Sequence, residues 1–511
     1  MYRQTTAYCS AVRIAFESHK YTDRIAQTAT PHRAPGTSDY SLERHIGWYS
    51  IVLLVLLGGY MFFDRAFAQL HIPGTPIYPA EPILAIGLVL AANSVEGRRL
   101  IRFSTPIRAL IGFMLWGFLL FAFWVFEYNL DALQDSALWY YGLFAIVAGA
   151  VFLTYRNALD RLIPIYTGAL GVFAVVAWVR LSMATNTGAL VPGTRVPWTA
   201  HRQGSIAVHA AIGFAFAVLI LAPYLAERME RLRAIAWTSA LAVPLLVLYF
   251  AAGTQNRGGL VAGFFVIIAV PMVARHFGPA MGALALAILA LFAALYISDV
   301  SFDLGRRDRP LSVRTIVENI VSVREGEDSG RINFWEPVVD DIITQEHFLT
   351  GLGFGENLGD RYRFRNLRER GADPLRNVHN SHLNVLARMG VIGIGFWVAL
   401  WGVWYYHLFR ARSRLRMVDS PRRAAFLGWS MLAAAAMLMN AFFDGTLEGP
   451  QAAVWLWSVF GLGAAIAMET NIREWRRRRT GAGEIAREGG GENPLEMSMR
   501  QLRKASKRAR R

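Results

Sequence analysis

The sequence predicts an all-α, polytopic membrane protein with about 12 transmembrane helices and one large periplasmic loop containing short helices. Of its 511 residues, 54% are hydrophobic and only 18% are charged, below the roughly 25% of soluble domains. Several uncharged runs reach the ~20 residues needed to cross a ~30 Å hydrocarbon core. These runs are continuously apolar rather than alternating, which favours helices over a β-barrel.

The apolar runs divide the chain into spans, one long loop and two tails. We predict a disordered cytoplasmic extension over 1–45, nine spans within 46–298, a periplasmic catalytic loop over 299–381, three spans within 382–469, and a basic cytoplasmic tail over 470–511. Both tails lack the apolar content needed for a core, and the last is rich in Arg and Gly. The individual spans are predicted at 46–66, 77–94, 106–126, 137–155, 162–181, 205–224, 234–252, 258–275, 279–298, 383–408, 424–443 and 450–469.

Arginine is distributed unequally between the two sets of alternating loops. One set carries sixteen arginines, among them Arg98, Arg161, Arg231 and Arg422, and the other carries five, which include Arg257. Because arginine gathers on cytoplasmic loops, this predicts an inner-membrane protein with both termini in the cytoplasm. The net charge of +16 is therefore explained by arginines that orient the protein in the membrane, and we do not expect a nucleic-acid partner.

The loop over 299–381 is predicted to contain two short helices. One covers roughly 312–323 and the other 331–347. The second would have an apolar face, formed by Ile332, Trp335, Val339, Ile342 and Ile343. Arg331 would lie one turn from Trp335, on the same side of that helix.

Glycine recurs in this loop at Gly351, Gly353 and Gly355. Glycines allow a sharp turn or a close approach of the backbone to a ligand. The run is not a nucleotide-binding fingerprint, because no buried strand precedes it and no Walker lysine follows. It predicts either a substrate-binding loop or a turn packed on the membrane surface.

The segment His379-Asn380-Ser381-His382 directly precedes a predicted span, and Gly390 and Gly393 follow within that span. Asn380 or Ser381 is suited to cap the helix. A helix N-terminus disfavours an imidazolium, so His379 would remain neutral, as a general base must. The alternatives are that His379 caps the helix or lies among lipid headgroups. His382, three residues on, is a rival base or a substrate contact.

Arg257 lies at the outer mouth of the predicted span 258–275. An arginine at this depth either extends to the interface or binds a partner. Its guanidinium matches phosphate oxygens, with Arg331 as a second contact.

Acidic and basic residues of two further outer segments have open interpretations. Asp444 and Glu448 are suited to pair with an outer arginine or to orient a histidine, unless they are solvated. The arginine-rich run 361–376 would bind an anionic headgroup or an acidic glycan, or be solvated. No metal-binding motif is present, and the single cysteine, Cys9, excludes an internal disulfide.

Taken together, these motifs resemble the O-antigen ligase and polymerase family, whose members transfer polyprenyl-diphosphate-linked glycans. The resemblance rests on Arg257 at a helix mouth, Arg331-x-x-x-Trp335, the glycine run, and His379-Asn380 followed by Gly390-x-x-Gly393. These motifs occur in the family's order, and the twelve-span topology also agrees. Ile394 stands where the ligase signature often continues with Thr, which leaves the choice between ligase and polymerase open.

This resemblance implies an inverting, metal-independent glycosyltransferase that needs no cofactor. His379 would take the proton of the acceptor hydroxyl, while Arg257 and Arg331 hold the donor diphosphate. Asn380, His382, Arg195, Arg202 and the three glycines would contact substrate. The implied partners are a polyprenyl-diphosphate-linked glycan donor, a lipid A-core or growing glycan acceptor, and the lipid bilayer. The alternatives are a polymerase of exopolysaccharide, capsule or O-antigen repeat units, a transporter of polysaccharide or lipid-linked sugar, and an inactive assembly component.

Overall fold

The computed structural model describes residues 37–488, except 72–77, 156, 184–187, 193, 195, 275–289, 291–293, 295, 299–300, 303–310, 313–328, 345–346, 363–375 and 418–419. Within this part, 37–43, 301–302, 311–312, 329–334 and 476–488 are described by their backbone alone. The chain divides into a first unit, Met1–Trp48, described from Thr37 onward, and a second unit, Tyr49–Arg511.

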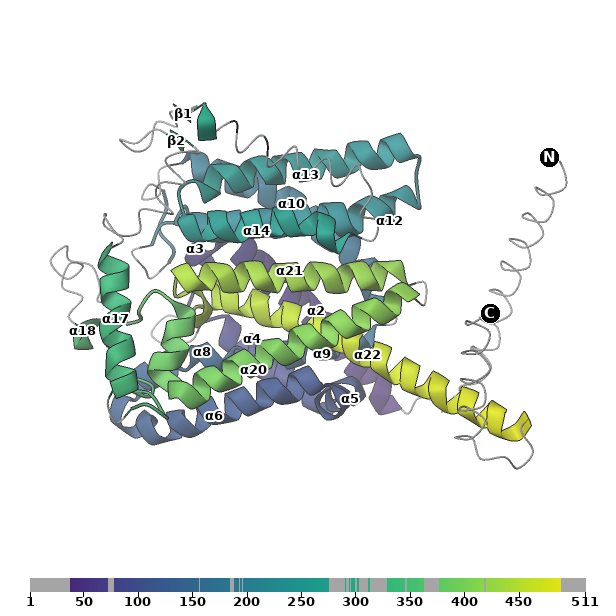
Figure 1. The fold of residues 1–511 in the computed structure, drawn as a ribbon, viewed down its shortest axis with the longest axis horizontal. Coiled ribbons are helices and arrows are strands. Elements are labelled where there is room, and N and C mark those ends of the chain that lie inside the picture. Colours follow the sequence, from purple (N-terminus) through teal and green to yellow (C-terminus); the bar gives the residue numbers. More distant parts are fainter. Residues whose placement is uncertain are drawn as a thin grey trace, which may run out of the picture. The chain divides into compact units, whose positions relative to one another are not determined.

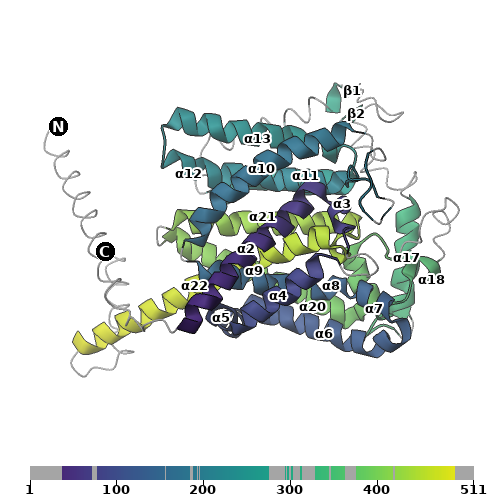
Figure 2. The same cartoon turned by 180° about the vertical axis from the view of Figure 1, so that it is seen from behind.

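Long helices dominate the second unit and run side by side (Figures 1 and 2). In chain order the first half contains α2 (Thr37–Phe63, which begins in the first unit), α3 (Arg65–Ala68), α4 (Ala80–Asn93), α5 (Val95–Phe103), α6 (Thr105–Tyr128), α7 (Leu130–Asp135), α8 (Ala137–Tyr140), α9 (Leu143–Thr154), α10 (Ala158–Ser182) and α11 (Gln203–Phe216). The second half contains the π-helical turn η1 (Ala217–Leu221), α12 (Ala222–Ala226), α13 (Arg231–Gly253), α14 (Arg257–Val273), α17 (Ser329–Thr344), α18 (Leu358–Arg361), α20 (Ser381–Met417), α21 (Pro421–Phe443), the 3₁₀ turn η2 (Thr446–Glu448) and α22 (Pro450–Glu488). Two-residue strands, β1 (Ser301–Phe302) and β2 (Leu311–Ser312), pair antiparallel.

The protein is an all-α, multi-pass membrane protein. Among the described residues, eight helices are long and apolar enough to cross a membrane, and two bent helix pairs raise the number to ten. The eight correspond to predicted spans 46–66, 106–126, 162–181, 205–224, 234–252, 383–408, 424–443 and 450–469. The bent pairs correspond to 77–94 and 137–155. Predicted span 279–298 lies almost entirely outside the described residues, as does most of the predicted helix 312–323.

The predicted span 258–275 corresponds to α14, a helix of 17 residues. At ~1.5 Å per residue it is shorter than a ~30 Å hydrocarbon core. Its two ends nevertheless meet opposite ends of its neighbours. A Cβ built on Gly258, at its start, would lie 2.7 Å from Phe443 Cβ at the end of α21. At its other end, Arg416 near the end of α20 donates a hydrogen bond of 2.9 Å to the Val273 carbonyl. Helix α14 therefore runs between the same two ends as the longer helices.

The bend of 85° between α4 and α5 has a local cause in Ser94. Ser94 takes an extended conformation that ends α4, and its Oγ accepts a hydrogen bond of 2.9 Å from the Gly97 N–H. This is the geometry of a helix N-cap. Helix α5 therefore starts afresh in a new direction, with Leu100 buried and Arg98 exposed.

The core of the second unit lies around α11, α21 and α22, the helices whose apolar segments are most buried. Trp401 on α20 stacks on Trp457 on α22, and Trp404 stacks on Phe460. By contrast, only about a quarter of the apolar segment of α6, α10 and α13 is buried, and these helices expose side chains such as Phe123 and Trp237. An apolar surface of this kind is what lipid-facing helices present.

Two sequence predictions about individual helices need correction. Helix α17 confirms the predicted helix 331–347, but Ile343 is 53% exposed and Val338, which was not predicted, is fully buried. Helix α22 continues to Glu488, so the prediction that the tail from residue 470 does not fold is wrong up to that point. The extension contains good helix formers, and it prolongs a helix that the membrane span already nucleates.

Candidate active site

The segments predicted to lie outside the membrane gather at one end of the helices. Helices α3, α7, α8, α17 and α18 lie at this end, on the left of Figure 1 and the right of Figure 2. The turns that join α12 to α13 and α20 to α21 lie at the other end. There, arginines of the rich set bind carboxylates of other segments, as in the pairs Arg422–Asp160 at 2.8 Å and Arg423–Glu469 at 2.7 Å. The structure thus separates the two sets of loops that the arginine count distinguished.

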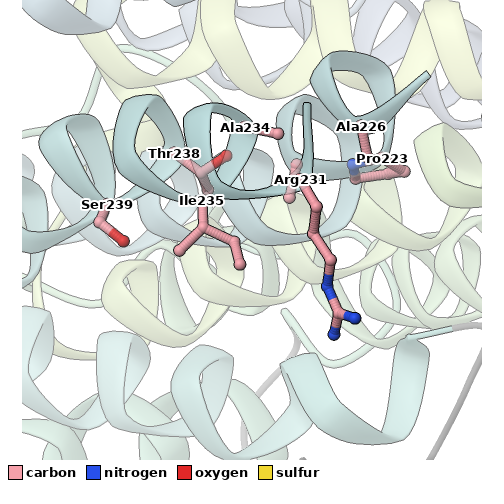
Figure 3. A pocket seen from close by; sticks show the side chains of 8 residues that line it. Pro223, Ala226, Arg231, Ala234, Ile235, Thr238 and Ser239 are labelled. Atoms are coloured by element: carbon pink, nitrogen blue, oxygen red, sulfur yellow. The ribbon is translucent and has the colours of Figure 1, made fainter. Parts of the chain in front are cut away.

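One cavity is excluded as the candidate active site by its location and by the residues that line it. A hollow of about 360 Å³ lies between α12 and α13 (Figure 3). It is lined by small and apolar side chains with Thr238, Ser239 and Arg231, whose guanidinium points away from the others. It lies toward the arginine-rich end, and none of the predicted site residues lines it.

His379 lies directly before α20, in an unusual backbone conformation. Its φ is +52°, in the left-handed region that non-glycine residues seldom adopt. The Asn377 side chain stabilises this conformation, because Asn377 Oδ1 accepts a hydrogen bond of 3.1 Å from the His379 N–H. Such strain is concentrated at functional sites, where the surrounding structure maintains it. The imidazole is 31% exposed and therefore accessible to a substrate.

Asp444, at the end of α21, contacts the imidazole. Its Oδ1 lies 3.5 Å from His379 Nδ1. A carboxylate in this position orients the ring and favours a proton on Nδ1, which leaves Nε2 as the basic nitrogen. In unliganded sites such contacts are often long. Of the two sequence interpretations of Asp444, orientation of a histidine therefore has direct support.

The other interpretation, pairing with an outer arginine, also holds for Asp444. Its Oδ2 lies 3.3 Å from Arg202 Nη1, so one carboxylate joins Arg202 and His379. The Arg202 backbone N–H donates a hydrogen bond of 2.6 Å to Asp64 Oδ2, which anchors this arginine before α11. We call His379, Asp444 and Arg202 the open cluster, because their side chains are 31%, 23% and 32% exposed.

Arg257 begins α14, close to the open cluster. Asn256 caps the helix by accepting a hydrogen bond of 2.8 Å from the Gly259 N–H. Residue 258 must be glycine here, because a Cβ would come within 2.7 Å of Phe443 and 3.1 Å of Asn440 Oδ1. Since Phe443 directly precedes Asp444, this packing brings the backbone of Arg257 beside the open cluster.

Arg331 is the third residue of α17, and its side chain is outside the described ones. One turn later, Trp335 Nε1 donates a hydrogen bond of 3.1 Å to the carbonyl of Val378, the residue before His379. The Trp335 ring also packs edge-on against Phe442 at the end of α21. Helix α17 is therefore held against the segment that carries His379. Arg195 lies outside the described residues.

The three motif glycines all have positive φ, of 68°, 76° and 111°. Atoms of the protein occupy the side where a Cβ would lie: the α20 backbone at Gly351, Trp124 at Gly353, and Tyr128 at Gly355. Glycine is thus required for packing, and contact between these residues and a ligand remains a prediction.

The glycine loop fits into a break in α20 at Gly390, where φ is +65°. Beside the break, the Leu352 N–H donates a hydrogen bond of 2.7 Å to the Ala387 carbonyl. The Val391 N–H donates one of 2.9 Å to the Phe348 carbonyl. The loop therefore satisfies backbone groups that the broken helix leaves unpaired.

Asn380 and His382 have roles within the protein. Asn380 Oδ1 accepts the N–H groups of His382 and Leu383 at 3.0 and 3.1 Å, which confirms the predicted helix cap. His382 Nδ1 accepts from Trp397 Nε1 at 3.0 Å, and its Nε2 lies 2.9 Å from the Leu438 carbonyl. Because a carbonyl only accepts, Nε2 carries the proton. Both ring nitrogens are therefore engaged, which favours His379 over His382 as the base. Contacts of Asn380 and His382 with substrate remain predictions.

Sequence reasoning missed two buried charged residues, Arg388 and Asp135. Together with Arg376, the last residue of the arginine-rich run, they form what we call the closed cluster. The Arg388 and Asp135 side chains are only 1% and 5% exposed, and their charged groups lie 3.0 Å apart. Arg376 Nη2 lies 3.1 Å from Asp135 Oδ2, the oxygen that Arg388 also contacts. It donates a hydrogen bond of 2.7 Å to the Gly355 carbonyl. Burial alone would lower the pKa of Arg376, but its bonds with Asp135 raise it. The sequence did contain a signal for Arg388, because an arginine six residues inside a predicted span indicates a specific partner.

The described ends of the arginine-rich run are engaged in similar pairs. Arg361 lies 2.8 Å from both Asp341 on α17 and Glu356 in the glycine loop. Residues 363–375 are outside the described part, so binding of an anionic headgroup or glycan by the run remains a prediction. Among the described residues, no group of three or more His, Cys, Asp or Glu is arranged to hold a metal ion.

Part of the chain matches a known protein family. Residues 241–398 match the family described as O-Antigen ligase. The chain contains an O-antigen ligase family domain. The match extends from within α13 to the middle of α20, and includes Arg257, Arg331, the glycine loop and His379. Arg202, Asp444 and Asp135 lie outside it. A search of curated proteins finds no match to the chain. Family membership indicates a ligase- or polymerase-type enzyme that acts on lipid-linked glycans at a membrane.

Proposed function

We propose that the protein is an inner-membrane glycosyltransferase that moves a glycan from a polyprenyl-diphosphate donor to a lipid or glycan acceptor. The reaction would take place at the periplasmic face, with the arginine-rich end and both termini in the cytoplasm. The observation that supports this most is the contact of Asp444 with both His379 and Arg202, beside the start of α14. A base with its orienting carboxylate and a group that binds phosphate are what this transfer requires.

In the proposed mechanism, His379 Nε2 takes the proton of the acceptor hydroxyl. The hydroxyl oxygen attacks the anomeric carbon from the side opposite the diphosphate, and the bond between that carbon and the diphosphate oxygen breaks. The configuration at this carbon is therefore inverted. Asp444 stabilises the imidazolium that forms. The proton leaves the site with solvent, so the base is neutral again for the next cycle.

Arginines would bind the leaving diphosphate. Arg257 at the mouth of α14, Arg331 on α17 and Arg202 are the candidates, because guanidinium groups bind phosphate oxygens in pairs of hydrogen bonds. The negative charge on the diphosphate increases as the glycosidic bond breaks, so positioned cations lower the barrier. Arg195 would be a further headgroup contact.

The base assignment is tested by His379→Ala in membranes that contain an undecaprenyl-diphosphate-linked glycan donor. We expect transfer to fall by about 10²–10⁴-fold, the usual contribution of a general base, while the protein remains in the membrane. His71→Ala is the matched control, since His71 follows α3 at the same end. Its described contacts are a hydrogen bond with the Gln69 carbonyl and a ring contact with Tyr78. Wild-type transfer by the His379 variant would contradict the proposal.

The acceptor separates a ligase from a polymerase. Wild-type membranes are given the same donor with and without lipid A-core. Product that requires lipid A-core identifies a ligase, and longer donor-linked chains formed without it identify a polymerase. Movement of the donor across the membrane without a new glycosidic bond would instead identify a transporter.

A further inference from the structure

Glu448 lies in the 3₁₀ turn η2, behind the segment that carries His379, and has no part in the mechanism above. The residue as a whole is only partly buried, but its carboxyl is enclosed by protein atoms. A carboxyl in such surroundings needs hydrogen-bond donors to remain ionised. Among the described residues, the amides of two asparagines face this carboxyl.

The first amide is that of Asn384, in the first turns of α20. Its Nδ2 donates a hydrogen bond to Glu448 Oε1. Its Oδ1 accepts one of 3.2 Å from the N–H of Val378. Asn384 is fully buried, so no water substitutes for either partner.

The second amide is that of Asn377, which faces the Glu448 carboxyl and lowers its pKa. Because an ionised carboxylate only accepts, the NH₂ group of Asn377 is the part of the amide that faces it, and Asn377 Oδ1 accepts a hydrogen bond of 3.1 Å from the His379 N–H. The amide packs directly against Gly445, where a Cβ would lie within 3.0 Å of it. The Asn377 side chain therefore has little room for another orientation.

Both amides thus connect one carboxylate to consecutive backbone N–H groups, those of Val378 and His379. An amide that donates through nitrogen to Glu448 must present oxygen to the backbone. The carboxylate therefore orients both amides in the one sense that accepts from the peptide. In the opposite sense, an NH₂ group would face an N–H, and a buried donor would lose its partner.

We propose that Glu448 is a positioning residue, which through Asn377 and Asn384 holds His379 in its left-handed conformation when its carboxyl is ionised. This inference rests on the proposed function of His379. A protonated carboxyl would carry an O–H and accept fewer hydrogen bonds, so one amide would lose its orientation. Transfer would then depend on the protonation of a residue that never touches the substrate.

Burial raises the pKa of Glu448 to about 7. Arg388 on α20 and the two asparagine amides oppose this effect, and Asp135 on α7 adds to it. Of the other elements that pack against η2, α8 presents Tyr140, whose hydroxyl points to Glu81, and α21 ends at Asp444. The carboxyl would therefore lose its charge as pH falls through about 7.

The experiment compares wild type with Glu448→Gln, in membranes with the undecaprenyl-diphosphate-linked glycan donor, from pH 5.5 to pH 9. Gln has the same shape but only one acceptor oxygen, so one amide is inverted at every pH. Above about pH 8, we expect wild type to exceed the variant on the order of 10- to 100-fold in kcat, the effect of a misplaced catalytic group. Below about pH 6 the ratio should approach one, because wild-type Glu448 is then protonated as well.

Controls separate this role from a merely structural one. Glu127→Gln changes an exposed carboxylate at the end of α6, at the same end of the molecule, and should match wild type at each pH. Asn377→Ala should show the same pH-dependent ratio as Glu448→Gln, and the double variant should be no worse than either. If Glu448→Gln does not accumulate, Asn377→Ala carries the test alone.

A ratio that stays constant with pH, or additive effects of Glu448→Gln and Asn377→Ala, would overturn the inference. Failure of the proposed function gives a different result, because wild type would then show no transfer at any pH, or His379→Ala would retain it. If wild type is active, His379→Ala is inactive and the ratio is constant, only the role of Glu448 is rejected.

Discussion

The open and closed clusters lie at the same end of the protein and contain the same kinds of charged side chain, but they differ in exposure. His379, Asp444 and Arg202 are each between 23% and 32% exposed. In the closed cluster Arg376 is also 23% exposed, but the Arg388 and Asp135 side chains are only 1% and 5% exposed. In the open cluster, charges can exchange partners with a substrate. In the closed cluster, every exchange would leave a charge unpaired in a low-dielectric region. One cluster is therefore suited to chemistry, and the other to holding the loops that surround it.

The largest expected effect comes from opening the closed cluster. Arg388→Met should lower the free energy of unfolding by about 3–5 kcal/mol, because it leaves Asp135 buried with one partner fewer. The measurement is chemical denaturation of the purified protein in detergent. Adding Asp135→Asn to Arg388→Met should restore part of the loss. An Arg388→Met variant that unfolds at the wild-type midpoint would show that the cluster is not structural.

In the open cluster, a change of charge should affect rate rather than stability. Asp444→Asn should reduce transfer by roughly 10²-fold, about 2.7 kcal/mol, because the imidazolium loses its counter-charge. Its unfolding should differ little from that of wild type. Asp360→Asn, at an exposed position on α18, is the matched control and should transfer normally. A loss of stability as large as that of Arg388→Met would erase the distinction between the clusters.

The break in α20 at Gly390 comes two residues after Arg388 of the closed cluster. Two glycines of that helix test whether the break is needed for stability. Gly390→Ala should cost about 1–3 kcal/mol of stability, because φ there is +65° and a Cβ would lie 2.3 Å from the Leu349 carbonyl oxygen. Gly395→Ala, where no atom lies within 4 Å, should be neutral or slightly stabilising. Equal effects of the two changes would mean that the loop does not depend on the break.

The smallest effect is expected at Asp341, whose nearly buried carboxylate pairs with the more exposed Arg361. Burial would raise its pKa, but hydrogen bonds from Arg361 and Tyr362 lower it overall. A lowered pKa stabilises the fold above the ordinary aspartate range, and this stability is lost as pH falls through the folded-state pKa. Asp341→Asn should therefore cost about 1 kcal/mol at pH 7, and less in acid. Equal losses at pH 7 and in acid, measured by denaturation, would contradict this assignment.

How far sequence predicts structure differs between elements and contacts. Most spans were predictable, because a helix that crosses lipid must be apolar over its whole length, and that is a local property. The cap at Asn380 was predictable for the same reason, since a cap acts within its own turn. Helix α14 meets the length criterion poorly, and its role as a span became visible only through its contacts with α20 and α21.

Some site residues could likewise be predicted from local sequence, whereas others depended on distant contacts. His379, Arg257 and Arg331 stand out in sequence because polar groups at a membrane mouth are unusual. Asp444 had two interpretations, and the structure shows both contacts at once. Arg388 was predictable in principle but its partner was not, because Asp135 lies more than 250 positions away. No local pattern connects residues at that separation.

By itself, the sequence determined that this chain crosses a membrane many times, and it predicted which loops share a face and which motifs resemble those of the family. Hydropathy, arginine bias and short motifs act over a few residues, so they can be read along the chain. Only the tertiary structure decided that one carboxylate would join His379 to Arg202, that His382 would be engaged by the protein, and that Glu448 would lie behind the catalytic segment. Those outcomes depend on which helix ends pack together, and packing is a property of the whole bundle.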